Sequence, residues 1–176
     1  NIITAISTTS SVQSGGICGV NNNAIKDCSI GDNNIITATS TSKTKYIYAY
    51  SGGICGYNGG SIENCSIGDN NIITATIKFT NSYVDSGGIC GWNYYSSITY
   101  CSIGDNNIIT ATSRSDDENS YAYSGGICGY KEGSGSIDGT IGSKNIIVAD
   151  DADYAYFTYN DENSVTTSSP SSPSSP

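Results

Sequence analysis

The chain has 176 residues, enough for one domain with a sizeable core, but only 36% of them are hydrophobic and 21 are glycine. Its formal net charge is -9, from 16 acidic and 7 basic residues, and it contains no histidine. This balance disfavours binding to nucleic acid or to anionic membranes, and no stretch approaches the roughly 20 apolar residues of a membrane span. We therefore expect a thin, repetitive protein that neither binds nucleic acid nor inserts into a membrane.

Three short blocks recur in the same order along the chain. The first, Asn-Ile-Ile-Thr-Ala, begins at residues 1, 34, 71 and 107, with the variant Asn-Ile-Ile-Val-Ala at 145. The second, Ser-Gly-Gly-Ile-Cys-Gly, begins at residues 14, 51, 86 and 124, and the third, Cys-Ser-Ile-Gly-Asp-Asn, at residues 28, 65 and 101. This near-constant period indicates a solenoid, in which each unit buries its apolar face against the next. The units cover residues 1–33, 34–70, 71–106 and 107–144, with a partial fifth unit at 145–164 and the whole repeat domain at 1–164.

Each unit predicts strands rather than helices. Gly-Gly, Asn-Asn and runs of β-branched Ile and Thr dominate, and no apolar stripe has helical spacing. A propeller would need about four strands per blade and normally more than four blades. The predicted fold is therefore all-β, a right-handed parallel β-helix of four full coils and a partial fifth, with loops that bulge just before each Ser-Gly-Gly.

Residues 52–65 read Gly-Gly-Ile-Cys-Gly-Tyr-Asn-Gly-Gly-Ser-Ile-Glu-Asn-Cys and closely resemble the GLUG repeat of secreted and cell-surface proteins. The resemblance covers the second and third blocks of all four units, about half of the chain. It implies a repetitive β architecture of the kind found in adhesins and surface proteins, and it carries no catalytic residue. The chain departs from the family pattern by placing Cys where an aliphatic residue is usual, and by its long inserts.

The seven cysteines include no Cys-x-x-Cys pair, and without histidine they fit disulfides better than a zinc site. One connectivity stays within each unit and joins Cys18 with Cys28, Cys55 with Cys65 and Cys90 with Cys101, which leaves Cys128 outside the bridges. The other crosses units and joins Cys28 with Cys55, Cys65 with Cys90 and Cys101 with Cys128. We favour the within-unit bridges, because Gly139 occupies the place of a partner for Cys128. The alternative is that all seven are buried, reduced and inert.

In a β-helix the repeated residues form rows along the axis, about 4.8 Å apart. Two asparagine rows, at 33, 70 and 106 and at 34, 71, 107 and 145, should hydrogen-bond from coil to coil. Asp32, Asp69 and Asp105 form a row of like charges, which is either solvated at turns or shares a cation. Calcium is the candidate cation, because it prefers carboxylate and carbonyl oxygens. We favour the solvated turn and expect no other cofactor.

Two further rows bear on function. A Thr-x-Thr array consists of Thr37, Thr39, Thr74, Thr76, Thr110 and Thr112. It is similar to the ice-binding face of some β-helical antifreeze proteins, although Thr is also an ordinary exposed strand residue. Tyrosines alternate at residues 46, 48 and 50, with equivalents at 121 and 123 and at 154 and 156. Such a row either stacks on sugar rings or packs as a strand face.

The sequence does not predict an enzyme. A nucleophilic triad usually needs His as its base, and no Gly-x-Ser-x-Gly, P-loop or dinucleotide motif occurs. Glycoside hydrolysis needs only two carboxylates. The acidic residues, however, occur at repeated turn positions or in exposed runs such as 116–118 and 150–153, and no unique cluster breaks the repeat.

The last segment, residues 165–176, holds all three prolines and predicts a polyproline II tail or linker. Its Ser/Thr/Pro composition resembles O-glycosylated stalks. The glycosylation candidates are Ser168, Ser169, Pro170, Ser171, Ser172, Pro173, Ser174, Ser175 and Pro176, with Asn64 in the repeat domain.

Together these features predict an extracellular or cell-surface location. The first functional hypothesis is a glycan-carrying structural subunit that self-associates head to tail into a filament, because the ends of a solenoid expose strand edges. The alternative is an adhesin-type carbohydrate-binding surface module. Ice binding through the Thr-x-Thr array is third.

Overall fold

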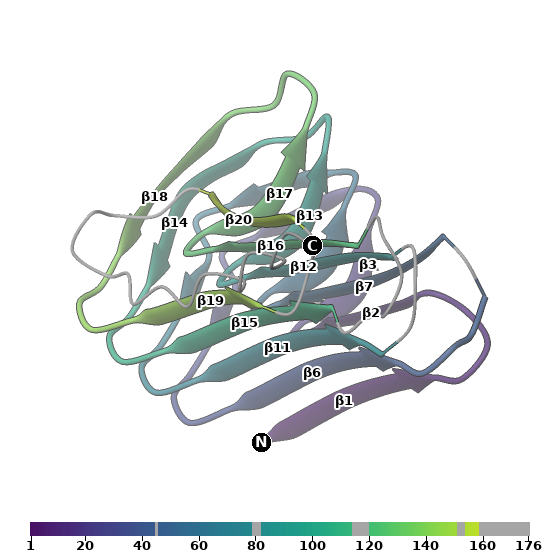
Figure 1. Ribbon diagram of the computed structural model, residues 1–176. Helices are drawn as coiled ribbons and strands as arrows, with labels where there is room; N and C mark the ends of the chain where they lie inside the picture. Colours follow the sequence, from purple (N-terminus) through teal and green to yellow (C-terminus); the bar gives the residue numbers. More distant parts are fainter. Residues whose placement is uncertain (45, 79–81, 114–119, 151–153, 159–176) are drawn as a thin grey trace.

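The computed structural model describes residues 1–44, 46–78, 82–113, 120–150 and 154–158. Every regular element in this part of the chain is a β-strand, and all the strand pairs are parallel. The strands stack coil upon coil into a β-solenoid of about four turns (Figure 1). This confirms the predicted parallel β-helix. The predicted polyproline II segment, residues 165–176, lies outside the described residues.

Two five-stranded sheets carry the first block and the segment before the second block. Sheet A is β1 (Ile2–Ser7), β6 (Ile35–Ser40), β11 (Ile72–Ile77), β15 (Ile108–Ser113) and β19 (Ile146–Asp150), in that order. Sheet B is β2 (Val12–Gly15), β7 (Ile47–Gly52), β12 (Ser82–Gly87), β16 (Tyr121–Gly125) and β20 (Tyr154–Thr158). Neighbouring strands lie in the register of the sequence repeat, so that Thr37 pairs with Thr74 and Thr74 with Thr110.

Two further sheets complete each coil. Sheet C is β3 (Cys18–Asn21), β8 (Cys55–Asn58), β13 (Cys90–Tyr94) and β17 (Cys128–Glu132). Sheet D is β4 (Ala24–Lys26), β5 (Ser29–Ile30), β9 (Ser61–Glu63), β10 (Ser66–Ile67), β14 (Ile98–Ile103) and β18 (Ile137–Ile141). In the third coil β14 spans both halves of sheet D and pairs with β9 and with β10.

The core follows from the two-residue alternation of the strands. In Ile-Ile-Thr-Ala-Thr the second Ile and the Ala point inward, and Ile36, Ala38 and their equivalents in the later coils are fully buried. Sheets A and B face each other through small residues such as Ala38, Ala49 and Val84, whereas Ile and Cys fill the space between sheets C and D. The solenoid is therefore narrow between sheets A and B and wider between sheets C and D.

Buried polar ladders hold the coils in register. The Nδ2 group of Asn34 donates to Oδ1 of Asn71 (2.9 Å), and the backbone N–H of Asn71 donates to Oδ1 of Asn107 (2.7 Å). A second ladder runs through sheet C, where Nδ2 of Asn58 donates to Oδ1 of Asn93 (2.7 Å). Each ladder satisfies polar groups that water cannot reach, which makes a shift of register costly.

No helix in the described part of the chain has the length and apolar character needed to cross a membrane.

Candidate functional site

Sheets B and C approach each other closely at the glycine that ends each Gly-Gly-Ile-Cys-Gly segment. A Cβ added at Gly56 would lie 2.8 Å from the carbonyl oxygen of Tyr50, and one at Gly91 would lie 2.8 Å from that of Asp85. Only glycine leaves room for this backbone contact. As a result, the outward side chains of sheet B and those of sheet C converge on one another.

Aromatic rings fill this corner. Tyr48 of β7 stacks on Tyr83 of β12, with ring centroids 5.6 Å apart, and Tyr83 stacks on Tyr121 at 4.9 Å. From sheet C, Trp92 meets the ring of Tyr50 edge-on at 4.9 Å and that of Tyr57 at 5.4 Å. The two sheets thus share one continuous aromatic surface, in which offset and edge-to-face contacts are favourable.

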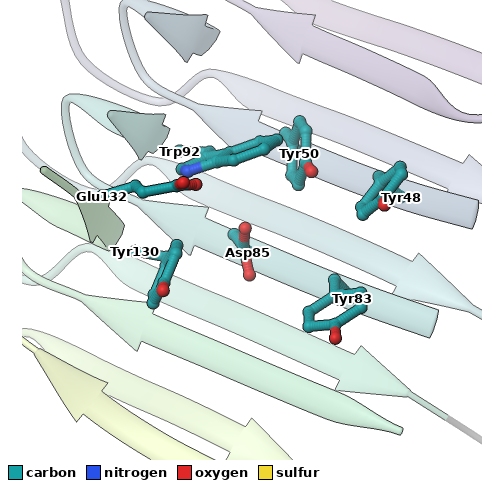
Figure 2. A pocket seen from close by; sticks show the side chains of 7 residues that line it. All are labelled: Tyr48, Tyr50, Tyr83, Asp85, Trp92, Tyr130 and Glu132. Atoms are coloured by element: carbon teal, nitrogen blue, oxygen red, sulfur yellow. The ribbon is translucent and has the colours of Figure 1, made fainter. Parts of the chain in front are cut away.

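A cavity of about 310 Å³ opens within this surface. It is lined by Tyr48, Tyr50, Tyr83, Asp85, Trp92, Tyr130 and Glu132. Figure 2 shows the Asp85 carboxyl among the surrounding tyrosine rings and the Glu132 carboxyl beside the indole of Trp92. We call this cavity the aromatic pocket.

The aromatic pocket exists because one row of sheet B is interrupted. The strand register aligns Gln13 with Tyr50, Tyr50 with Asp85, and Asp85 with Tyr123. Asp85 is therefore the small residue between two tyrosines of neighbouring coils. The space that a third ring would fill becomes the cavity.

Asp85 is almost completely buried, with 2% of its surface exposed. Burial among apolar rings disfavours the charged carboxylate and raises the pKa of Asp85 well above its usual value. Burial also raises the pKa of Tyr50, and the carboxyl of Asp85 adds to that effect. The pocket thus favours uncharged side chains that can donate or accept hydrogen bonds.

Two buried polar atoms at the pocket lack a hydrogen-bond partner among the described residues. They are Oδ1 of Asp85 and Nε1 of Trp92. Buried polar groups are usually paired, because an unpaired one costs on the order of 1–3 kcal/mol.

The predicted calcium row has a structural role in the fold. Oδ1 of Asp32 accepts from the backbone N–H of Asp69 (2.8 Å), and Oδ1 of Asp69 accepts from that of Asp105 (2.7 Å). Oδ1 of Asp105 accepts from the N–H of Ser143 (2.7 Å). Each carboxylate thus binds the turn of the next coil. Over the described residues, no group of three or more Cys, Asp or Glu side chains is arranged to hold a metal ion, and calcium binding stays a prediction.

One of the two predicted asparagine ladders is present, and the other has a different role. The row at 34, 71, 107 and 145 is buried and hydrogen-bonded between coils. The row at 33, 70 and 106 instead adopts positive φ values of 58°, 57° and 57° and is exposed at the turn. Asparagine tolerates this left-handed conformation better than most residues.

The structure contains no bond between any two of the seven cysteines. The two cysteines of a unit lie in different sheets, so that Cys55 belongs to sheet C and Cys65 precedes β10 of sheet D. Parallel register instead brings together equivalent cysteines of successive coils, and Sγ of Cys55 lies 3.8 Å from Sγ of Cys90. The within-unit pairing was inferred from spacing along the chain and not from the stacking of coils, and it stays a prediction.

The threonine array forms a regular patch on the outer face of sheet A. The pairs at 37 and 39, 74 and 76, and 110 and 112 lie in register on three adjacent strands and are partly exposed. Asn64 is exposed, and its Nδ2 group donates to Oδ1 of Asp27 (2.6 Å). The other glycosylation candidates, residues 168–176, lie outside the described residues.

Sequence analysis found the tyrosine row but missed the pocket. It did not select Asp85, Trp92 or Glu132, and it expected no unique acidic cluster. The sequence did contain a signal of this pocket, because Asp85 occupies the position at which two other units carry a tyrosine, Tyr50 and Tyr123. Trp92 and Glu132 come from sheet C, and only the fold places them beside sheet B.

Comparison of the chain with protein-family models, with curated proteins and with solved structures found no match. The resemblance to the GLUG repeat therefore stays a prediction.

Proposed function

We propose that this chain is a carbohydrate-binding surface module of an extracellular protein, and that the aromatic pocket binds a sugar ring. The observation that carries the proposal is the pocket itself, a cavity of about 310 Å³ lined by five aromatic rings and two carboxyl groups. Its size lies at the lower end of the range for small-molecule sites, roughly 300–1,000 Å³.

The chemistry of the lining suits a sugar. A pyranose ring has apolar C–H faces that pack on aromatic rings and hydroxyl groups around its edge that need hydrogen-bond partners. The aromatic rings of the lining supply apolar contacts, while Asp85 and Glu132 supply polar groups. A protonated Asp85 could donate a hydrogen bond to a sugar oxygen.

The charge of the pocket and of the whole chain limits the class of sugar that the pocket can bind. No basic side chain lines the pocket, and the chain has a formal net charge of -9. Sulfated or uronic-acid glycans would meet only carboxyl groups and would be repelled. The expected ligands are neutral oligosaccharides.

Titration calorimetry with a panel of neutral and acidic oligosaccharides tests the proposal. Removal of an aromatic ring that lines the pocket should weaken binding at least about tenfold, so Trp92→Ala and Tyr83→Ala should both lose affinity. The matched control is Tyr100→Asn, which removes an exposed tyrosine of sheet D and keeps a residue suited to its φ of 55°. If no neutral oligosaccharide binds, or if the three variants bind equally well, the pocket does not bind sugars.

A filament subunit is the second candidate, and the first coil favours it. The core positions Ile3 and Ala5 are only half-buried, whereas their partners Ile36 and Ala38 in the next coil are fully buried. A further coil stacked on this one, from the same chain or from a second copy, would cover these positions and pair with β1. Light scattering tests this candidate: polymers that grow with concentration would support it, and a monomer at millimolar concentration would contradict it.

A further inference from the structure

Sheet C carries a continuous stack of cysteines through the interior of the solenoid. The cysteine stack consists of Cys18, Cys55, Cys90 and Cys128. Each is the register partner of the next. The sulfurs of Cys55 and Cys90 are 3.8 Å apart, and the same register places Cys18 beside Cys55 and Cys128 beside Cys90.

We propose that the cysteine stack is a site of cross-coil disulfide formation, with the bridges Cys18–Cys55 and Cys90–Cys128. Neighbouring strands lie about 4.8 Å apart, within the Cα separation of roughly 4.4–6.8 Å that a disulfide spans. Register partners project from the same face of neighbouring strands, so a bond requires the two side chains to rotate toward each other. Each bridge would link one coil covalently to the next.

The number of cysteines in the stack favours this pairing over a central bridge. The two bridges use all four members of the stack, whereas a central bridge between Cys55 and Cys90 would leave the outer two without a neighbouring thiol. The other cysteine row, at 28, 65 and 101, has an odd number of members. Its thiols donate to the carbonyl oxygens of Lys26, Glu63 and Thr99, at 3.2, 3.3 and 3.4 Å.

The first bridge can form in the folded chain by exchange with a small disulfide such as oxidised glutathione. Cys18 is the only half-buried member of the stack, since Cys55, Cys90 and Cys128 are fully buried. The Cys18 thiolate attacks oxidised glutathione and releases one glutathione. The Cys55 thiolate then attacks the Cys18 sulfur of the mixed disulfide and releases the second. Two protein thiols are oxidised, one oxidised glutathione is reduced, and both protons pass to the released glutathione.

Two features shape the rates of the two bridges. A hydrogen bond with Cys55 and burial raise the pKa of Cys18, which lowers its thiolate fraction and slows the first step. Glutathione cannot reach Cys90 or Cys128 in the folded chain, because both are fully buried. The second bridge therefore requires oxidation during folding, before the coils close.

Disulfide mapping tests the proposal. Reduced, folded protein is exposed to oxidised glutathione, and a second sample is refolded in a glutathione redox buffer; both are then alkylated and digested with trypsin and chymotrypsin. Chymotrypsin cleaves at Tyr57 and Trp92, which separates Cys55 from Cys65 and Cys90 from Cys101. The folded sample should contain Cys18–Cys55 alone, and the refolded sample should contain both bridges.

Two variants serve as controls. Cys55→Ser should lose the first bridge and keep Cys90–Cys128, while Cys101→Ser, a buried cysteine outside the stack, should keep both. The refolded, bridged protein should melt at least about 5 °C above the reduced form. A map that showed Cys18–Cys28 or Cys55–Cys90, or a stack still reduced after refolding, would overturn the proposal.

Discussion

The outer face of sheet A and the aromatic corner of sheets B and C are built on the same stacked coils, yet they differ in regularity. Sheet A repeats one pattern, with partly exposed threonines in register from Thr37 to Thr74 to Thr110. In the corner the residues change from coil to coil, and Asp85 interrupts a row of tyrosines. The repetition produces a flat, uniform surface, and a single departure from it produces a pocket.

The outer face of sheet A and the aromatic corner can differ in regularity, because neither of them sets the register of the coils. The buried asparagine ladders do this. A serine row adds bonds within each coil, in which Oγ of Ser51 donates to the carbonyl of Ile36 (3.3 Å) and Oγ of Ser86 to that of Ile73 (3.2 Å). These interactions lie inside the solenoid, so substitutions outside leave them intact. The following predictions test this separation between inner ladders and outer faces.

The largest effect should come from a break in an inner ladder. Asn71→Ala removes the Oδ1 acceptor of two bonds from Asn34 and the Nδ2 donor to the carbonyl of Gly68 (3.0 Å). Because buried donors are left unpaired, we expect a loss of about 3 kcal/mol or more in the free energy of unfolding, measured with urea. The control Asn70→Gly keeps the positive φ at the exposed neighbour and should cost much less. Equal losses in the two variants would show that the ladder does not hold the coils.

Restoring the interrupted row should close the aromatic pocket. In Asp85→Tyr the third coil would carry the same residue as Tyr50 and Tyr123. We expect sugar affinity to fall at least about tenfold and the free energy of unfolding to change by no more than about 1.5 kcal/mol. Calorimetry and urea unfolding measure the two quantities. A variant that still binds sugar at full affinity would place the ligand outside this cavity.

Asp85 should also impose a pH dependence on stability. Burial raises its pKa, so the folded chain binds this proton more tightly than the unfolded chain does. The contribution of Asp85 to stability is therefore fully present below the ordinary Asp pKa of about 3.9 and is lost as pH rises through its raised pKa in the folded chain. Asp85→Asn, which mimics the neutral acid, should remove this fall and be more stable than the parent chain at pH 7.5.

Urea unfolding of both chains at pH 4 and pH 7.5 measures the difference. Asp138→Asn, at an exposed aspartate of β18, controls for the loss of one negative charge. Parallel pH profiles for the parent chain and Asp85→Asn would contradict the assignment.

The smallest effect should come from a substitution on the outer face of sheet A. Thr74→Val keeps the β-branched shape on a partly exposed strand position and should change the free energy of unfolding by less than about 0.5 kcal/mol, with sugar binding unchanged. The ice-binding hypothesis predicts that the same substitution also affects thermal hysteresis. If the array binds ice, the parent chain shows thermal hysteresis and Thr74→Val reduces it; if the parent shows none, the hypothesis is wrong.

The sequence by itself determined the period, the strands and the rows. Repeated blocks with two-residue alternation place Ile36 and Ala38 inside and Thr37 outside, and each copy stacks on its equivalent because identical residues pair best in parallel register. The threonine array, one asparagine ladder and the tyrosine row could all be predicted on that basis.

Only the tertiary structure decided which rows meet. Cys55 approaches Cys90 and not Cys65, because contacts in a solenoid run between coils and the cysteines of one unit belong to different sheets. Trp92 and Asp85 share a pocket because glycine lets the backbone of sheet C pack on that of sheet B. The angle between two sheets depends on backbone contacts across many residues, and the repeat along the sequence does not specify that angle.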